Sequence, residues 1–219
     1  SMAKSVKANA FKNNNLLRRV IMPECENVYD YAFAGSSIKE LSMPKLERAW
    51  ENSFASTTNW TVNTTIDLPA LKTIDNNAFT GIYLGSGNSI RMNIENVETI
   101  GTMAFYESNG IIFLPFEGPY HDLILPKCTS IGDAAFSCYY SYLHQVFHNI
   151  ILDSIETIGN SVFNRNQFSA DANNHSIVRF GPNISSIGSG IFSTTSDLGS
   201  RGTDPTLGYN IYGAWIDMY

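Results

Sequence analysis

Apolar residues recur along the chain in units of similar pattern. Each unit contains a phenylalanine, usually preceded by alanine, and consecutive phenylalanines lie 21 to 31 residues apart. The eight positions are Phe11, Phe33, Phe54, Phe79, Phe105, Phe136, Phe163 and Phe192. Self-similarity at such a period is typical of solenoids, in which each unit is one coil that stacks on its neighbours.

Two further apolar columns precede the last seven phenylalanines at fixed offsets. Eight residues earlier stand Cys25, Leu46, Leu71, Val97, Cys128, Ile155 and Ile184. Five residues earlier stand Val28, Ala49, Ile74, Ile100, Ile131, Ile158 and Ile187. A single unit is too small to bury three apolar columns, so we expect them to pack between stacked coils.

A strand with alternating apolar residues begins most units. The alternating pairs are Val20 and Met22, Leu41 and Met43, Ile66 and Leu68, Met92 and Ile94, Leu123 and Leu125, and Ile150 and Leu152. This period of two predicts a strand with one buried face. Proline follows at Pro23, Pro44, Pro69 and Pro126, where it removes a backbone donor and ends the strand.

The rest of the unit predicts a short second extended segment, a glycine turn and a helical or 3₁₀ turn that carries the phenylalanine. Gly101, Gly132, Gly159 and Gly188 share one column, which indicates a positive φ or a close backbone approach. Tyr29, Trp50 and Asp75 occupy that column in earlier units. Eight coils at strand spacing predict a rod of parallel β-structure on the order of 40 Å long. We expect the solenoid to span residues 1–192 and residues 193–219 to cap the same domain.

Composition narrows the classes of partner. The 219 residues are 43% hydrophobic and carry a net charge of −6 without a cluster of Lys and Arg, so a nucleic-acid partner is not expected. No apolar run within this segment is long enough to insert into a membrane. Three cysteines form neither an even disulfide set nor a metal-binding motif.

The clearest unit runs Leu125-Pro126-Lys127-Cys128-Thr129-Ser130-Ile131-Gly132-Asp133-Ala134-Ala135-Phe136. It resembles the repeat of BspA-like leucine-rich-repeat surface proteins, and the resemblance extends over nearly all of residues 3–192. The resemblance implies a right-handed leucine-rich-repeat coil. It also implies a cell-surface or secreted protein of gut or oral bacteria or of mucosal protozoa, in which such arrays adhere to host proteins or other cells. The family supplies no catalytic residues, so neither an enzymatic activity nor a cofactor is expected.

The strand positions between the buried ones point outward and form the default binding face. Arg91, Asn93, Ile124, Ile151 and Arg179 lie on it, and two adjacent isoleucines would give a protein partner an apolar anchor between polar groups. Ordinary stacking of side chains along a solvated sheet is the alternative interpretation of the same residues.

Aromatic insertions between the units provide a second candidate site. Tyr139 and Tyr140 lie in one insertion with Phe147, Trp60 lies in another, and residues 106–121 are a third. Such rings provide rigid contact area for a protein or for sugar rings, so the hypothesis here is glycan binding. The alternative is that Tyr139, Tyr140 and Phe147 seal the edge of a widened coil.

Chemistry-bearing residues are few. His144 and His148 have zinc-like spacing but no evident third ligand, so we expect no metal site. Glu40 and Asp67 lie on the strand face of adjacent units and would be the carboxylates of a polysaccharide-cleaving enzyme, although a sheet surface also displays such pairs by accident. Four Asn-x-Ser/Thr sequons, at Asn59, Asn63, Asn174 and Asn183, are acceptor sites only in a host that glycosylates them.

Overall fold

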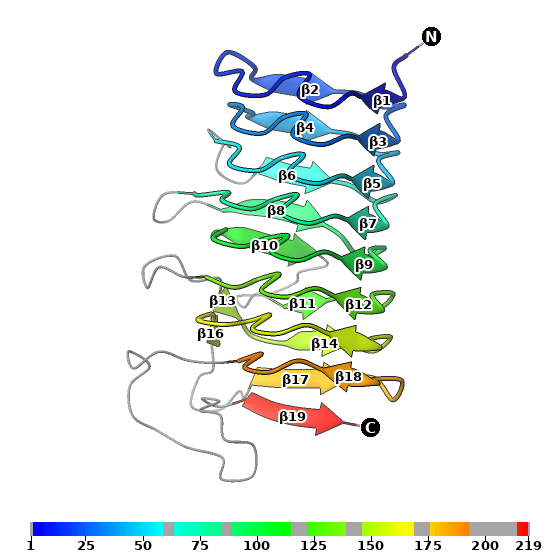
Figure 1. Cartoon of the computed structure of the whole chain (residues 1–219), viewed down its shortest axis with the longest axis vertical. Helices are drawn as coiled ribbons and strands as arrows, with labels where there is room; N and C mark the ends of the chain where they lie inside the picture. Colours follow the sequence, from blue (N-terminus) through cyan, green and yellow to red (C-terminus); the bar gives the residue numbers. More distant parts are fainter. Residues whose placement is uncertain are drawn as a thin grey trace.

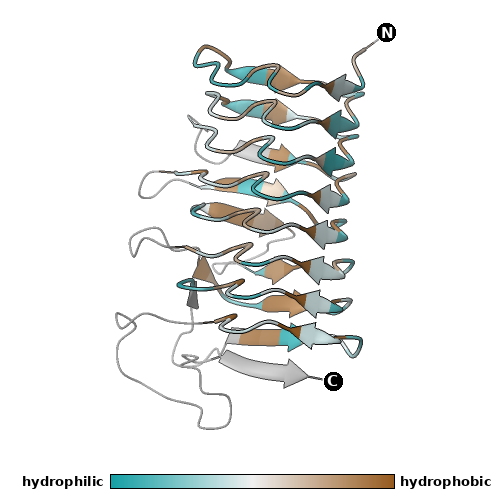
Figure 2. Ribbon diagram, viewed as in Figure 1, coloured by the Kyte–Doolittle hydropathy of each residue, from teal (hydrophilic) through white to brown (hydrophobic). Residues whose placement is uncertain are grey.

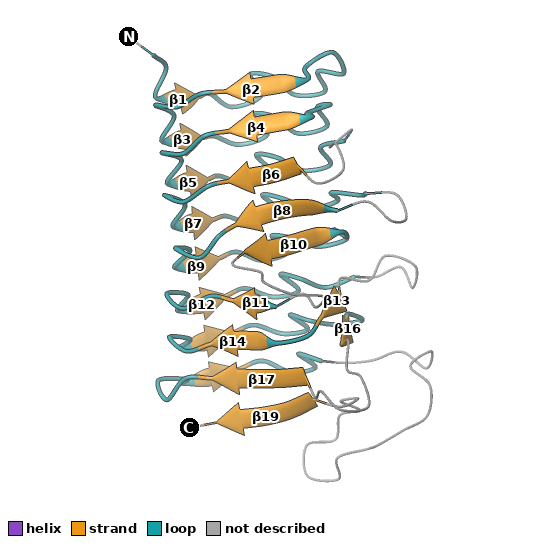
Figure 3. Ribbon diagram, turned by 180° about the vertical axis from the view of Figure 1, so that it is seen from behind, coloured by secondary structure: helices purple, strands orange, loops and turns teal. Residues whose placement is uncertain are grey.

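The computed structural model describes residues 2–58, 64–84, 89–114, 122–138, 146–168, 176–192 and 214–218. The chain winds as a stack of coils, and each coil adds strands to two columns of arrows, visible in Figure 1 and from behind in Figure 3. Every strand pair in these columns is parallel, and the described residues contain no helix. The fold is therefore the repeat solenoid that the sequence predicts.

The second extended segment of each unit forms one continuous sheet. Its eight strands, in spatial order, are β1 (Ser5–Val6), β3 (Asn27–Val28), β5 (Arg48–Ala49), β7 (Thr73–Ile74), β9 (Thr99–Ile100), β12 (Ser130–Ile131), β15 (Thr157–Ile158) and β18 (Ser186–Ile187). Each predicted unit contributes one strand, which confirms eight coils.

The main strands form two sheets rather than one. The first contains β2 (Arg19–Ile21), β4 (Glu40–Ser42), β6 (Thr64–Asp67), β8 (Ile90–Asn93) and β10 (Ile111–Leu114). The second contains β11 (Leu123–Ile124), β14 (Ile150–Leu152), β17 (Ser176–Phe180) and β19 (Ala214–Met218). A separate pair, β13 (Val146–Phe147) and β16 (Gln167–Phe168), lies beside the second sheet (Figure 3).

Strand β10 lies where the sequence predicts only an aromatic insertion. Ile111–Leu114 pairs with β8 in full register and extends the first sheet, whereas β11 later in the same coil pairs with β14. The sixth coil, which carries Phe136, therefore contains two strand segments, and the outward face predicted as one stripe is divided between β10 and β11. The β19 strand, inside the segment predicted as a cap, pairs with β17 at the end of the second sheet.

The core is a ladder of phenylalanine rings along the solenoid axis. All eight predicted phenylalanines stack in chain order, with neighbouring ring centroids 5.1 to 5.5 Å apart and interplanar angles of 3° to 11°. The two flanking columns are buried from Cys25 to Ile158. At the last rung Ile187 is 44% exposed, because β18 is an edge strand of its sheet. The insertions of unequal length therefore leave the stacking register intact.

The segment that carries each phenylalanine is a run of turns, not the predicted helical or 3₁₀ turn. In the third coil the N–H of Phe54 donates to the carbonyl of Ala78 in the next coil (2.8 Å), whereas the N–H of Ala55 donates to the carbonyl of Asn52 three residues back (3.1 Å). Asn52 and Ser56, two residues before and after Phe54, have φ of 55° and 53°. These left-handed residues interrupt helical dihedrals and let alternate N–H groups bond between coils.

The glycine column reflects close backbone approach and not positive φ. A Cβ atom on Gly132 would lie 2.5 Å from the backbone nitrogen of Thr102 in the preceding coil, and one on Gly159 would lie 2.5 Å from that of Asp133. Positive φ occurs instead at residues such as Ala134 and Ser161, two positions before the phenylalanines. Of the two explanations that the sequence leaves open, the structure therefore selects close approach.

Candidate functional site

Three of the predicted binding residues lie in one row across the second sheet. Ile124 of β11 is in register with Ile151 of β14, which is in register with Arg179 of β17. All three side chains are partly exposed, and the neighbouring Ile177 is 39% exposed. Figure 2 shows β14 brown along its length, whereas β2 and β4 mix teal and brown. This part of the strand face is thus apolar at its centre.

Polar side chains on both sides of the isoleucine row are held in place by hydrogen bonds. The guanidinium of Arg179 donates to both carboxylate oxygens of Asp153, at 2.7 Å each. On the other side, Asp122 accepts from the N–H of Asn149 (3.0 Å), and Asn149 accepts from the N–H of Ile177 (2.9 Å). We call the surface made by Ile124, Ile151, Ile177, Arg179 and Asp153 the isoleucine patch. Its polar rim is pre-organised by contacts between coils.

The other two predicted residues lie apart from this patch. Arg91 and Asn93 belong to β8 in the first sheet, with β10 beside them on the side of the second sheet. Asn93 donates to Asp67 (3.4 Å), while Arg91 is exposed and forms no ion pair within the described part of the chain. Ile112, opposite Arg91, is only 8% exposed although it occupies an outward position. The five predicted residues therefore form two groups rather than one continuous site.

Two of the described aromatic residues in the insertions, Phe113 and Phe147, belong to the core. Phe113 and Phe147 are 3% and 0% exposed, and both contact Phe136 edge to face, at 5.7 and 6.1 Å between ring centroids. The burial of Phe147 agrees with the structural interpretation given for it, that it seals a widened coil. Tyr139, Tyr140 and Trp60 lie outside the described residues, and glycan binding by them stays a prediction.

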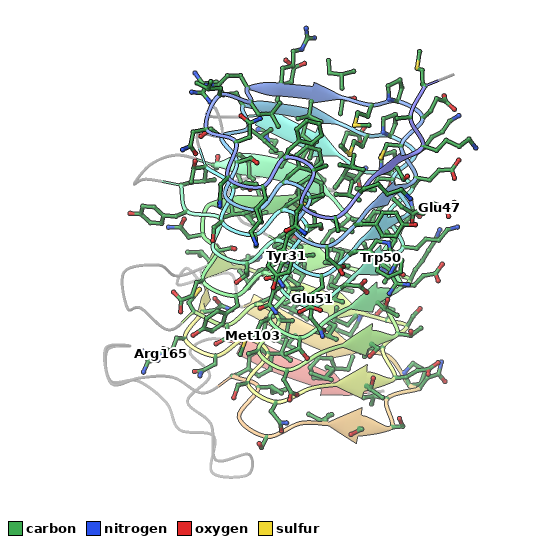
Figure 4. The ribbon with its side chains drawn as sticks, turned by 45° about the horizontal axis from the view of Figure 1, so that its top comes forward. Tyr31, Glu47, Trp50, Glu51, Met103 and Arg165 are labelled. Atoms are coloured by element: carbon green, nitrogen blue, oxygen red, sulfur yellow. The ribbon has the colours of Figure 1, made fainter. Side chains whose placement is uncertain are left out.

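Sequence reasoning missed a depression on the opposite side of the coils from the strand face. It has a volume of about 330 Å³ and is lined by residues of the second to fourth coils, namely Asp30, Arg48, Trp50, Glu51, Asp75 and Asn76. Trp50 and Glu51, labelled in Figure 4, belong to the third coil, the middle one of the three that line the depression. The available signal was the glycine column, because Tyr29, Trp50 and Asp75 stand where later coils have glycine.

The candidate residues for catalysis and metal binding interact with different neighbours. Glu40 forms an ion pair with Arg19 in the preceding coil (2.8 Å), and Asp67 is in register with Ser42 rather than with Glu40. His148 is buried with its Nδ1 3.5 Å from Asp122, and His144 lies outside the described residues. Among the described side chains, no group of three or more His, Cys, Asp and Glu has an arrangement suited to a metal ion.

The cysteines belong to the apolar interior. Cys25, Cys128 and Cys138 are free thiols with no exposed surface. Burial raises the pKa of the Cys128 thiol to about 12, because the low-dielectric core disfavours a thiolate. These positions therefore serve packing.

Comparison with known proteins agrees with the repeat structure. Residues 1–112 and 119–202 match the BspA type leucine rich repeat region, in six copies. The interval between the two matched ranges begins within β10, where the sixth coil departs from the pattern. No curated protein and no solved structure matches the chain.

No helix within the described ranges has the length and apolarity to cross a membrane. Leucine-rich repeats generally mediate protein interactions, and the match covers most of the sequence. The chain belongs to the BspA-type leucine-rich-repeat family.

Proposed function

We propose that this chain is a cell-surface or secreted adhesion module that binds a host or cell-surface protein through the isoleucine patch. The observation that carries the proposal is the register of Ile124, Ile151 and Arg179 across three adjacent coils. Family membership supports the location, because BspA-type repeat proteins are typically surface-exposed or secreted. It also supports the kind of partner, because the repeats are protein-interaction modules.

The patch has the anatomy of a protein-binding surface. Its partly exposed isoleucines would lose water on contact, and each apolar side chain buried this way contributes roughly 1.5–3 kcal/mol. The Arg179–Asp153 pair at its edge is already ordered, so a partner would form polar contacts there without paying to immobilise the arginine. Apolar centres with polar rims are the usual arrangement of such interfaces.

The proposal is of binding without catalysis. The two carboxylates that glycoside cleavage would require have different partners: Glu40 pairs with Arg19, and Asp67 accepts from Asn93. A cleavage mechanism needs two carboxyl groups that act on one bond. The separate engagement of these two side chains supports a recognition function.

The test is binding of the purified chain to an array of host matrix and cell-surface proteins. Ile124→Glu/Ile151→Glu places two charges at the centre of the patch, and we expect it to weaken the captured interaction at least tenfold. The matched control is Ser130→Glu/Thr157→Glu, which places two charges at neighbouring positions on the same two coils in the eight-stranded sheet. We expect the control to bind like the unmodified chain.

Two results would contradict the proposal. If no protein on the array binds the chain, the adhesion function is wrong. If a protein binds but both double variants weaken it equally, the patch is not the site. Equal urea midpoints for the variants and the unmodified chain would establish that any loss of binding is not a loss of folding.

A further inference from the structure

We propose that the depression around Trp50 is a binding site for a neutral glycan, separate from the isoleucine patch. Its volume of about 330 Å³ lies at the lower end of the range for small-molecule sites. At about 30 Å³ for each water molecule, it has room for about ten of them. One hexose unit, with about a dozen heavy atoms, matches that size.

The walls of the depression are rigid. The ring of Trp50 lies 5.0 Å from that of Tyr29 in the preceding coil, and the Arg48 guanidinium is 3.9 Å from the Trp50 ring centroid. Arg48 also donates to both carboxylate oxygens of Asp75 in the next coil, at 2.9 and 3.1 Å, and Trp50 Nε1 donates to Asn27 (3.3 Å). Contacts across three coils therefore hold the tryptophan in one position, so ligand binding would cost little ordering.

Acceptors in the depression are free to bind hydroxyl groups. The carboxylates of Asp30 and Glu51 line it, and neither forms an ion pair within the described ranges. Within the described part of the chain, the only hydrogen bond to the Glu51 carboxylate comes from the adjacent Asn52 amide, at 3.3 Å. Ionised carboxylates accept up to about four hydrogen bonds each. Most of the capacity of Asp30 and Glu51 to accept hydrogen bonds therefore remains for a ligand.

Donors in the depression are free as well. In later coils the backbone N–H at the equivalent position is bonded to the side chain of the preceding coil, as Asn160 is to Asp133 (2.6 Å) and Ser189 to Asn160 (2.9 Å). The N–H groups of Glu51 and Asn76 have no such acceptor among the residues that the structure describes. A sugar hydroxyl both donates and accepts, so it satisfies carboxylates and N–H groups side by side.

Charge selects among glycans. Asp30, Glu51 and Asp75 carry three negative charges, and Arg48, already paired with Asp75, carries the only positive charge in the lining. Sulfated and sialylated sugars would be repelled by this excess of negative charge. The ligand class is therefore a neutral hexose or N-acetylhexosamine.

The test is isothermal titration of the chain with neutral, sulfated and sialylated oligosaccharides and with a tetra-arginine peptide. We expect a neutral oligosaccharide to bind and the acidic ones not to bind. Asp30→Asn/Glu51→Gln should weaken that binding at least tenfold, and Glu51→Gln alone should weaken it by a smaller factor. The matched control is Asp133→Asn, the same change at the equivalent position of a coil without the depression, and it should leave affinity unchanged.

Other outcomes overturn the proposal. If no neutral sugar binds, the glycan site is wrong. If only the arginine peptide binds, the depression holds a basic protein segment instead. If a sugar binds with equal affinity to the Asp30/Glu51 variants, it binds elsewhere on the chain. Ile124→Glu/Ile151→Glu should bind the sugar normally, so failure at this site is distinguishable from failure of the proposed adhesion surface.

Discussion

At the scale of single residues, each turn imposes two different requirements on the backbone, close approach at one position and positive φ two residues later. Gly132 is needed because its coil approaches the backbone of Thr102 too closely for a side chain. Two residues later Ala134 adopts a φ of 53°, a conformation that favours glycine, although the sequence has alanine there. Gly132 thus fits the narrow space between two coils, whereas Ala134 carries backbone strain.

This contrast predicts opposite effects of exchanging the two residue types. Gly132→Ala should lower the free energy of unfolding by about 1–3 kcal/mol, because the added methyl group overlaps backbone atoms that have little room to move. Ala134→Gly should raise it by about 0.5–1 kcal/mol, because glycine adopts positive φ without strain. Urea denaturation of both variants provides the measurement. Loss of stability in Ala134→Gly would contradict the account of the turn.

Burial of the thiols predicts their reactivity. Cys25, Cys128 and Cys138 have no exposed surface, and burial raises the pKa of Cys128 to about 12, so no thiolate is accessible near neutral pH. A thiol-specific reagent at pH 8 should leave the folded chain unlabelled and label all three cysteines in denaturant. Rapid labelling of Cys25 or Cys128 before unfolding would show that the core column is open.

At the scale of elements, the phenylalanine ladder joins the coils into one core. Phe105 is 2% exposed and stacks between Phe79 and Phe136, with Phe113 packed edge to face against it. Phe11, by contrast, stacks on Phe33 alone in the ladder and is 37% exposed. The same residue type therefore contributes differently in the middle and at the first rung.

Truncation of these two rings tests the ladder. Phe105→Ala should destabilise the chain by about 3–5 kcal/mol, because a large cavity opens between coils that cannot collapse without breaking their register. Phe11→Ala should cost clearly less, because water already reaches that ring. The urea midpoints of the two variants give the comparison, and equal losses would contradict the assignment of Phe11 as a terminal rung.

At the scale of the whole molecule, the repeated features were predictable and the unique ones were not. The columns that contain Leu46, Ile74 and Phe79 recur in at least seven of the eight coils, so an exception in one coil does not obscure the pattern. The β10 strand occurs once. Its run Ile111–Leu114 is followed by Pro115, as in a regular unit, but His121 and Leu125 stand where a regular unit has its glycine and phenylalanine. The proline alone was an incomplete signal of the repeat, so the division of the predicted face was missed.

The candidate sites follow the same rule. The row of Ile124, Ile151 and Arg179 was predictable, because alternation along strands fixes which side chains point outward. The depression at Trp50 depends on which side chains of three successive coils contact one another, and spacing along the chain does not specify such contacts. Its only sequence signal is the replacement of glycine by Tyr29, Trp50 and Asp75.

Hydrogen–deuterium exchange of the chain with its captured protein partner tests the central claim most directly. Protein recognition through the isoleucine patch predicts slower exchange in β11, β14 and β17, with β12 and β15 on the same coils unchanged. Protection confined to the eight-stranded sheet or to the coils around Trp50, with β11, β14 and β17 unaffected, would contradict it.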